Sequence, residues 1–291
     1  MEHLHFENGI SIRSSRIFNP KTGRCVAVAM DHGVALGAVN GLEQIGLRLE
    51  QVLSAKPDAV LIGPGTIRRY GYMLLGRESP AAILAVDFPL FGAYPGGDKI
   101  DAEVPTVSAE EAARLGADMV KIVMIFGQEQ VDRQIQNFSN IARTIEQCHR
   151  IGLPVMVEPT TWGLRFGGKN TKDAKLLTDM ARIAYEVGAD IVKSDFPQDP
   201  REMEMIARAC PVPVVLLGGD KSSSLRDMLS SVLTCVQCGA AGVTFGRNVW
   251  QHADTGRIVR AIQKVVHDED LSGALQELGE SAVEPAHHSG S

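Results

Sequence analysis

The segment Gly188-Ala-Asp-Ile-Val-Lys-Ser-Asp-Phe-Pro197 contains the unit that repeats along this chain. Gly188 is typical of the residue that ends a helix, and the short apolar run after it is typical of a buried strand. That strand ends on Lys193, in a place with little water. Poor hydration disfavours the ammonium and favours the free amine, which can attack a carbonyl. The alternative is a lysine whose stem packs while its ammonium reaches solvent.

The same unit of apolar run and helical spacing recurs from one end of the chain to the other. The expected strands are 25–31, 59–63, 81–86, 119–125, 154–157, 191–193, 212–217 and 242–245. The expected helices are about 41–54, 65–75, 108–115, 128–151, 172–187, 199–209, 222–237 and 255–268. Eight strands that alternate with eight helices predict an α/β fold, a single (β/α)₈ TIM barrel.

Two details support the barrel over an open doubly wound sheet. The apolar runs are continuous rather than alternating, which indicates strands covered on both faces. The stretch after the first strand, Asp31-His-Gly-Val-Ala-Leu-Gly37, lacks the glycine-rich phosphate fingerprint of dinucleotide-binding sheets. We therefore expect residues 1–24 to form a lead-in, 25–270 the barrel domain and 271–291 a loose C-terminal tail.

Composition excludes several classes of protein. The chain has 291 residues, 22% of them charged, a net charge of −6 and no basic block, which argues against a nucleic-acid surface. No long apolar run and no signal-like N-terminus is present, so we expect a cytoplasmic location without membrane contact. The 5 cysteines do not indicate a disulfide framework, and Cys235-x-x-Cys238 lies in an apolar helical run. We expect no metal and no cofactor.

Ionisable residues gather where the predicted strands end. In a barrel, the carboxyl ends of the strands carry the chemistry. Lys121 lies within an apolar strand, where a charge needs a partner, and it is expected to pair with Glu158 or Asp31 or to act as a second ammonium beside Lys193. Lys193 is the preferred nucleophile because it lies at a strand tip. Glu158 and Asp31 are the candidates for proton transfer.

The last two strand ends predict a phosphate site. Gly218, Gly219 and Gly246 permit a close approach of the backbone to an anion. Lys221 adds a positive charge and Arg247 a bidentate clamp. The alternative is that the glycines serve turn geometry alone. A further site candidate, His32, is either a substrate contact or a hydrogen-bonded structural residue.

Four stretches resemble one known family: Met30-Asp-His-Gly33, Val192-Lys193, Leu217-Gly-Gly-Asp-Lys221 and Gly239-Ala-Ala-Gly-Val-Thr-Phe-Gly-Arg-Asn-Val-Trp-Gln251. They look like the DeoC/LacD class I aldolases, in the branch of archaeal-type fructose-bisphosphate aldolases and the phospho-autoinducer-2 thiolase. The resemblance covers residues 16–268. It implies a Schiff base on Lys193, phosphate at the last two strand ends and a homo-oligomer, often a decamer. Asp31 matches the family's active-site aspartate.

One departure concerns the proton donor. Archaeal-type aldolases carry a tyrosine in a Tyr-Pro-Arg-Gly turn, where this chain has Val157-Glu-Pro-Thr160. That turn is more similar to the tagatose-bisphosphate and sulfofructose-phosphate aldolases, in which a glutamate and a second lysine accompany the Schiff-base lysine. The resemblance therefore assigns proton transfer to Glu158. Lys121, as a second ammonium beside Lys193, is predicted to tune Lys193 by like-charge repulsion.

The predicted function is that of a class I aldolase, an aldehyde-lyase, acting on a phosphorylated keto sugar. One alternative keeps the lysine but transfers an acyl group from a phosphorylated diketone to coenzyme A. A second alternative is a non-catalytic barrel that binds sugar phosphates and whose Lys193 is chemically inert.

Overall fold

The computed structural model describes residues 8–90, 101–218 and 224–280. Within these residues eight parallel strands close into a barrel, in the spatial order β1-β10-β9-β8-β7-β6-β3-β2. This confirms the predicted TIM barrel and excludes the open sheet. The strands are β1 (Cys25–Ala29), β2 (Ala59–Ile62), β3 (Ala81–Ala85), β6 (Met119–Ile125), β7 (Val155–Thr160), β8 (Ile191–Ser194), β9 (Val214–Leu217) and β10 (Gly242–Phe245).

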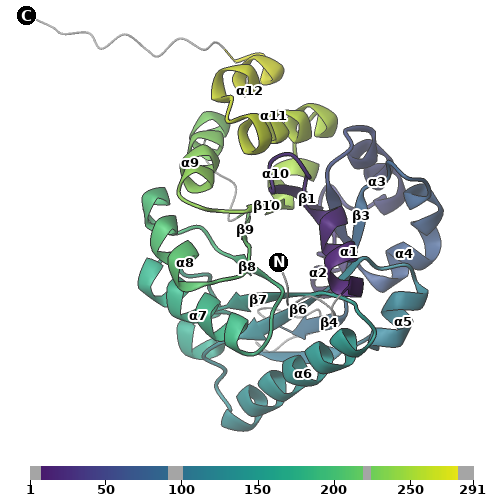
Figure 1. The fold of residues 1–291 in the computed structure, drawn as a ribbon, viewed down its shortest axis with the longest axis vertical. Coiled ribbons are helices and arrows are strands. Elements are labelled where there is room, and N and C mark those ends of the chain that lie inside the picture. The colour runs from purple at the N-terminus through teal and green to yellow at the C-terminus, as the bar shows by residue number, and fades with distance from the viewer. Residues whose placement is uncertain (1–7, 91–100, 219–223, 281–291) are drawn as a thin grey trace, which may run out of the picture.

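Helices surround the strands on the outside of the barrel (Figure 1). Several of the amphipathic ones begin at side-chain caps that the sequence provides; for example, Asp173 accepts a hydrogen bond from Leu176 N. The expected cap of Ser108 is present too, accepting from Glu111 N. The helices are α2 (Gly33–Leu36), α3 (Ile45–Ser54), α4 (Pro64–Tyr70), α5 (Ala109–Arg114), α6 (Val131–Arg150), α7 (Ala174–Glu186), α8 (Met203–Ala209), α9 (Leu225–Gln237), α10 (Arg247–Trp250) and α11 (Thr255–Asp268).

The helix-to-strand turns take the conformation that their glycines predicted. Gly116, Gly152, Gly188 and Gly239 all have positive φ, between +70° and +110°. A side chain with a Cβ atom is strained there, so glycine ends each helix at low cost. A glycine at the end of a helix therefore lets the chain reverse within a short turn, so that the next strand enters the barrel directly after the helix.

The lead-in contains a helix that the sequence pattern did not predict. Helix α1 (Asn8–Ile17) lies across the middle of the barrel in Figure 1. Its last residue, Ile17, is fully buried against interior residues such as Cys25 and Ala59, from the amino ends of their strands. Arg13 donates to Gly152 O at 2.7 Å, in the turn that precedes β7. Helix α1 therefore closes the amino end of the barrel, so the opposite end is left for a site.

Two further elements were not expected. Strands β4 (Asp87–Leu90) and β5 (Ala102–Pro105) form an antiparallel pair that follows β3. Each is short and contains a proline, so the apolar pattern did not single them out. Helix α12 (Leu271–Leu278) lies at the start of the segment expected to be a loose tail. Its Ala274 and Leu275 are buried in the main core, and the helix packs on α11.

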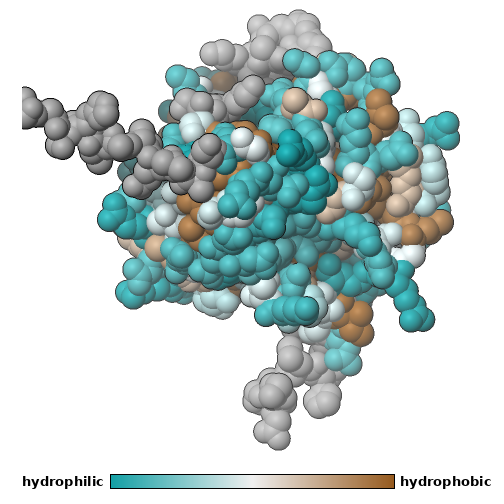
Figure 2. Space-filling view, turned by 90° about the horizontal axis from the view of Figure 1, so that it is seen from above, coloured by the Kyte–Doolittle hydropathy of each residue, from teal (hydrophilic) through white to brown (hydrophobic). Residues whose placement is uncertain are grey.

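The core has two parts, as a barrel requires. One lies between the strands and the surrounding helices, and the other fills the barrel interior with residues from alternate strand positions. Outside, hydrophilic residues predominate on the face shown in Figure 2, and apolar residues form small separate patches. None of the helices in residues 8–90, 101–218 and 224–280 combines the length and hydrophobicity that crossing a bilayer requires.

Candidate active site

Three neighbouring strands each direct one charged side chain into the barrel interior. Met119, Met156 and Ile191 belong to the interior core of β6, β7 and β8. Side chains alternate along a strand, so the residues two positions further on point inward as well. Those residues are Lys121, Glu158 and Lys193. The alternation along each strand thus places each charge two residues beyond an apolar interior residue of the same strand, toward the carboxyl end of that strand.

Glu158 contacts both lysines. Its Oε2 atom lies 2.8 Å from Lys121 Nζ and 3.1 Å from Lys193 Nζ. Asp31, which follows β1 on the other side of the barrel, places its Oδ2 3.5 Å from Lys121 Nζ. Lys121, Glu158 and Lys193 are almost completely buried. The expected ion pair of Lys121 is therefore confirmed, with both carboxylates at once.

Burial and charge act on these groups in opposite directions. Burial opposes ionisation of Glu158, but Lys121 and Lys193 outweigh it and hold the pKa of Glu158 below its usual value. The same balance, with the same two lysines, lowers the pKa of Asp31. Burial also disfavours the Lys121 ammonium, yet Glu158, Asp31 and Asp87 together raise the pKa of Lys121. Both carboxylates are therefore ionised at neutral pH, and Lys121 is a permanent cation.

A cavity of about 830 Å³ opens beside these groups at the carboxyl ends of the strands. Eight of the ten residues that the sequence singled out line it: Asp31, His32, Lys121, Glu158, Lys193, Gly218, Gly246 and Arg247. The other two, Gly219 and Lys221, lie outside the described residues. The cavity is large enough for a sugar phosphate. The same end of the fold therefore collects the predicted nucleophile, the acid and base candidates and part of the predicted anion site.

His32 lies against the backbone of the eighth barrel strand. A Cβ atom at Gly246 would approach His32 Cε1 to 2.5 Å, so glycine at this position makes room for the imidazole. The ring also packs edge-on against Trp250, with centroids 5.2 Å apart. Burial lowers the pKa of His32, although Asp31 opposes the shift. His32 is therefore a neutral, tightly packed wall of the cavity, and Gly246 serves this packing as well as any approach of a ligand.

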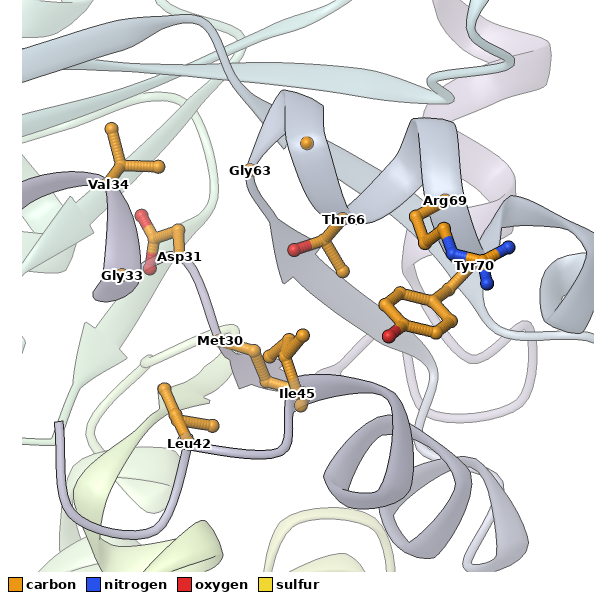
Figure 3. Close-up of a pocket in the computed structure, with 11 residues that line it drawn as sticks. Met30, Asp31, Gly33, Val34, Leu42, Ile45, Gly63, Thr66, Arg69 and Tyr70 are labelled. Atoms are coloured by element: carbon orange, nitrogen blue, oxygen red, sulfur yellow. The ribbon is translucent and has the colours of Figure 1, made fainter. Parts of the chain in front are cut away.

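A second, smaller cavity of about 480 Å³ adjoins the first. Figure 3 shows it with Asp31 and Val34 on one side and Arg69 and Tyr70 on the other. Asp31 and Val34 line both cavities. Its remaining walls are mainly apolar and come from the first two strand ends and helices α3 and α4. The Asp31 carboxylate therefore stands at the boundary between the two spaces.

Two other buried carboxyls line the large cavity, and the sequence analysis gave neither a role. Burial raises the pKa of Asp87 to about 6, while Lys121 and a hydrogen bond from Val123 N at 2.6 Å oppose the shift. Burial raises the pKa of Asp195 to about 7. The signal that could have found Asp195 is its position two residues after Lys193, on the same side of the strand.

No group of three or more His, Cys, Asp or Glu side chains in the described part of the chain is arranged to hold a metal ion. The Cys235-x-x-Cys238 pair has the spacing of metal ligands, but Cys235 is fully buried in the main core and Cys238 packs at the edge of that core. Both cysteines belong to the packing of α9 rather than to a site.

Comparison with known proteins identifies the family. The family description DeoC/LacD family aldolase matches residues 25–252. The chain belongs to this family. Among its relatives is the 3-hydroxy-5-phosphonooxypentane-2,4-dione thiolase of Klebsiella pneumoniae, 31% identical over 89% of this chain and 82% of the relative. Another is the 2-amino-3,7-dideoxy-D-threo-hept-6-ulosonate synthase of Halobacterium salinarum, 32% identical over 88% of this chain and 92% of the relative.

Solved structures of aldolases of this family type share the fold. An archaeal fructose 1,6-bisphosphate aldolase is 27% identical, with a TM-score of 0.75 over 89% of this chain and 99% of that chain. An archaeal fructose-1,6-bisphosphate aldolase whose catalytic lysine is covalently bound to the carbinolamine intermediate of its substrate matches equally well, at 26% identity and a TM-score of 0.75 over the same shares. The DeoC/LacD aldolase is thus confirmed as a class I, Schiff-base type of enzyme, an aldehyde-lyase.

Proposed function

We propose that this DeoC/LacD aldolase cleaves or forms a carbon–carbon bond in a phosphorylated keto sugar through a Schiff base on Lys193. The observation that carries the proposal is the position of the Lys193 amine. It is almost fully buried at the end of β8, borders the large cavity and lies 3.1 Å from a carboxylate oxygen of Glu158. A buried amine beside a base and an empty space of substrate size is the arrangement that attack on a ketone requires.

Each neighbour of Lys193 has a role in this reaction. Glu158 takes the proton that the ammonium loses before Nζ attacks the ketone carbon, and it returns protons when the carbinolamine loses water. The resulting iminium accepts the electron pair of the breaking carbon–carbon bond and becomes an enamine. Asp31 helps to move protons on the opposite side of the cavity. Lys121 keeps Glu158 ionised and in place.

The phosphate is assigned to the ends of the last two barrel strands. Gly218, Gly246 and Arg247 line the large cavity there, so two glycines that permit a close backbone approach and one guanidinium border the same space. The relatives named above support a phosphorylated substrate, since one acts on a phosphonooxy diketone and a solved neighbour on fructose bisphosphate. A cytoplasmic homo-oligomer is part of the same proposal.

Reductive trapping tests the nucleophile. The protein is incubated with dihydroxyacetone phosphate and borohydride, and the modified peptide is found by mass. We expect the adduct on Lys193, its loss in Lys193→Met and its retention in Lys175→Met, which changes an exposed lysine of α7. An adduct on Lys121 would reassign the nucleophile. Absence of any adduct, with sugar phosphate still bound, would instead support a non-catalytic barrel.

The thiolase names of several relatives at 30% to 32% identity favour one second candidate, acyl transfer from a phosphorylated diketone to coenzyme A. The two reactions differ in the acceptor. Incubation with 3-hydroxy-5-phosphonooxypentane-2,4-dione in the presence and absence of coenzyme A separates them. Formation of an acyl-coenzyme A product supports the thiolase, and carbon–carbon cleavage of a keto sugar phosphate without coenzyme A supports the aldolase.

A further inference from the structure

Asp195 follows directly after β8 and continues its line of inward-facing residues. Ile191 belongs to the barrel interior, Lys193 follows two positions later, and Asp195 two positions after that. Residues spaced by two along an extended chain share a face, with a rise of about 3.3 Å per residue. Asp195 therefore stands one layer closer to the mouth of the barrel than Lys193. Both side chains line the large cavity, and both are almost completely buried.

One oxygen of the Asp195 carboxyl accepts a hydrogen bond, and the other has no hydrogen-bond partner among the described residues. Its Oδ1 accepts a hydrogen bond from Asn170 Nδ2 at 2.5 Å. Asn170 is fixed in turn, because its Oδ1 accepts from Trp162 Nε1. The second oxygen of Asp195, Oδ2, is buried and has no hydrogen-bond partner among the described residues. A buried polar atom without a partner is unfavourable, so its presence in a cavity wall indicates a ligand contact.

The charges around Asp195 differ from those around the other two carboxylates of the site. Burial raises its pKa to about 7, and Glu158 on β7 adds to the shift, while Asn170, Lys193 and Lys172 oppose it. Asp227 of α9 and Arg247 of α10 line the same cavity. Glu158 and Asp31 have lowered pKa values. At neutral pH Glu158 and Asp31 therefore start the reaction as carboxylates, whereas the Asp195 carboxyl can either hold a proton or release it.

Asp87 is the competing carboxyl, but it faces a different part of the site. The charged groups that act on it are Lys121, Glu158 and Asp31, whereas those that act on Asp195 include Lys193. One oxygen of Asp87 also accepts from Val123 N, which completes the hydrogen bonding of β6 beyond the end of β3. Asp87 Oδ1, like Asp195 Oδ2, is buried without a hydrogen-bond partner among the described residues, so the difference between the two carboxyls is one of position. Asp87 is influenced by Lys121, whereas Asp195 follows Lys193 by two residues and therefore lies alongside a substrate attached to Lys193.

We propose that Asp195 is a further catalytic residue, which exchanges the proton of the substrate hydroxyl next to the carbon–carbon bond that breaks. This inference rests on the proposed Schiff base. In cleavage, the ionised carboxylate takes the hydroxyl proton, the oxygen becomes the aldehyde carbonyl, and the bond electrons pass to the iminium to give the enamine. In synthesis, the protonated carboxyl gives that proton to the aldehyde oxygen while the enamine carbon attacks. Asn170 is a positioning residue that holds the carboxyl toward the cavity.

Two half-reactions separate this role from Schiff-base formation. The first is deuterium exchange from D₂O into dihydroxyacetone phosphate, which needs the imine and enamine on Lys193 but not the second carbonyl. The second is condensation with glyceraldehyde 3-phosphate. We expect Asp195→Asn to retain exchange and the borohydride adduct but to lose condensation by about 10²-fold or more, the usual contribution of a general acid. Asp179→Asn, an exposed aspartate of α7, is the matched control and leaves both unchanged.

The pH profile distinguishes proton transfer from a structural effect. Wild-type condensation falls, and cleavage rises, as the pH passes through about 7, the pKa of Asp195. Asp195→Asn abolishes this step. Asn170→Ala removes a hydrogen bond that stabilises the ionised carboxyl, so the midpoint of the pH step in the condensation rate moves to higher pH. If Asn170 had only a structural role, its replacement would leave that midpoint unchanged. Asp195→Glu restores part of the condensation rate.

Several outcomes would overturn the inference. One is a normal condensation rate and pH profile in Asp195→Asn. Another is loss of exchange in step with condensation in that variant, or disappearance of the pH step in Asp87→Asn instead. If wild-type protein forms no adduct and exchanges no deuterium, the proposed function itself is wrong, and the role of Asp195 falls with it. If adduct and exchange are normal and only the variant result disagrees, the Schiff base stands and the Asp195 role alone is rejected.

Discussion

Lys121 and Lys193 both contact the same carboxylate oxygen, Oε2 of Glu158, at 2.8 and 3.1 Å. Two buried ammonium groups are thereby held next to each other by a single negative charge, with Asp31 as a second partner of Lys121. The arrangement is sensitive to the loss of any member, because each buried charge that remains would lack compensation.

Replacing Lys121 tests whether the cluster is a unit. Lys121→Met leaves Asp31 without its buried cation and Glu158 with only Lys193. We expect the free energy of unfolding to fall by about 3–5 kcal/mol, as for other broken buried pairs. Turnover should fall by about 10²-fold or more because Glu158 loses its fixed position. Urea unfolding and steady-state kinetics measure the two effects.

The control is Lys175→Met, which removes an exposed lysine paired with Asp179 at 2.6 Å. A surface pair contributes about 0–1 kcal/mol, so its stability and turnover should stay close to wild type. If Lys121→Met behaves like this control, Lys121 has neither of the two roles.

Burial of Glu103 should make the free energy of unfolding fall as the pH rises toward 7. Burial raises its pKa to about 7, and the hydrogen bonds from Asn140 and Asn137 only partly oppose this. A carboxyl whose pKa is raised by folding stabilises the folded state below its unfolded pKa of 4.5 and loses that contribution as the pH rises through about 7. Glu103→Gln keeps an oxygen for both asparagines and removes the titration. We expect it to be more stable than wild type at pH 8, by about 1–3 kcal/mol.

At pH 4.5 the difference between Glu103→Gln and wild type should be small, because both carry a neutral side chain there. Urea unfolding at the two pH values gives the comparison. The exposed Glu146 of α6 supplies the matched control, since Glu146→Gln removes a charge that water already solvates. A stabilisation that is equal at both pH values would show that Glu103 is ionised in the folded protein.

Arg247 tests the assignment of the phosphate. Arg247→Met should raise the KM for dihydroxyacetone phosphate by about 10-fold to 10²-fold, since charge-assisted bonds to an anion contribute about 1.5–3 kcal/mol. Trapping of unphosphorylated dihydroxyacetone on Lys193 should change much less. Arg257→Met, on the exposed side of α11, is the matched control. An equal loss with both ketones would place the phosphate elsewhere.

Two isoleucines of helix α1 test whether this helix closes the amino end of the barrel. Ile17 is fully buried and Ile12, on the same helix, is 66% exposed. Ile17→Ala leaves a cavity and should lower the free energy of unfolding by about 2–5 kcal/mol. Ile12→Ala should change it by about 0.5 kcal/mol or less. Thermal or urea unfolding compares the two, and equal effects would mean that α1 does not close the barrel in solution.

The sequence by itself determined the barrel and singled out eight of the residues that line the large cavity. Local signals sufficed, because helix-ending glycines such as Gly188, buried apolar runs and cap residues such as Ser108 act over a few positions. The rule that chemistry gathers at strand ends then pointed to Lys193, Glu158 and Asp31. The lead-in helix α1 was missed because its packing partners lie in distant turns, and β4 and β5 are too short to show a pattern.

Only the tertiary structure decided how the charges meet. Lys121, Glu158 and Lys193 come from three strands far apart in the chain, and their shared contact depends on barrel register, which spacing along the sequence does not encode. The same is true of Asp195, whose raised pKa arises from its burial in the cavity wall and from the nearby Glu158, against the hydrogen bond from Asn170. The residue types determine which side chains can carry a proton. The packing of the barrel determines their burial and neighbouring charges, and so their pKa values.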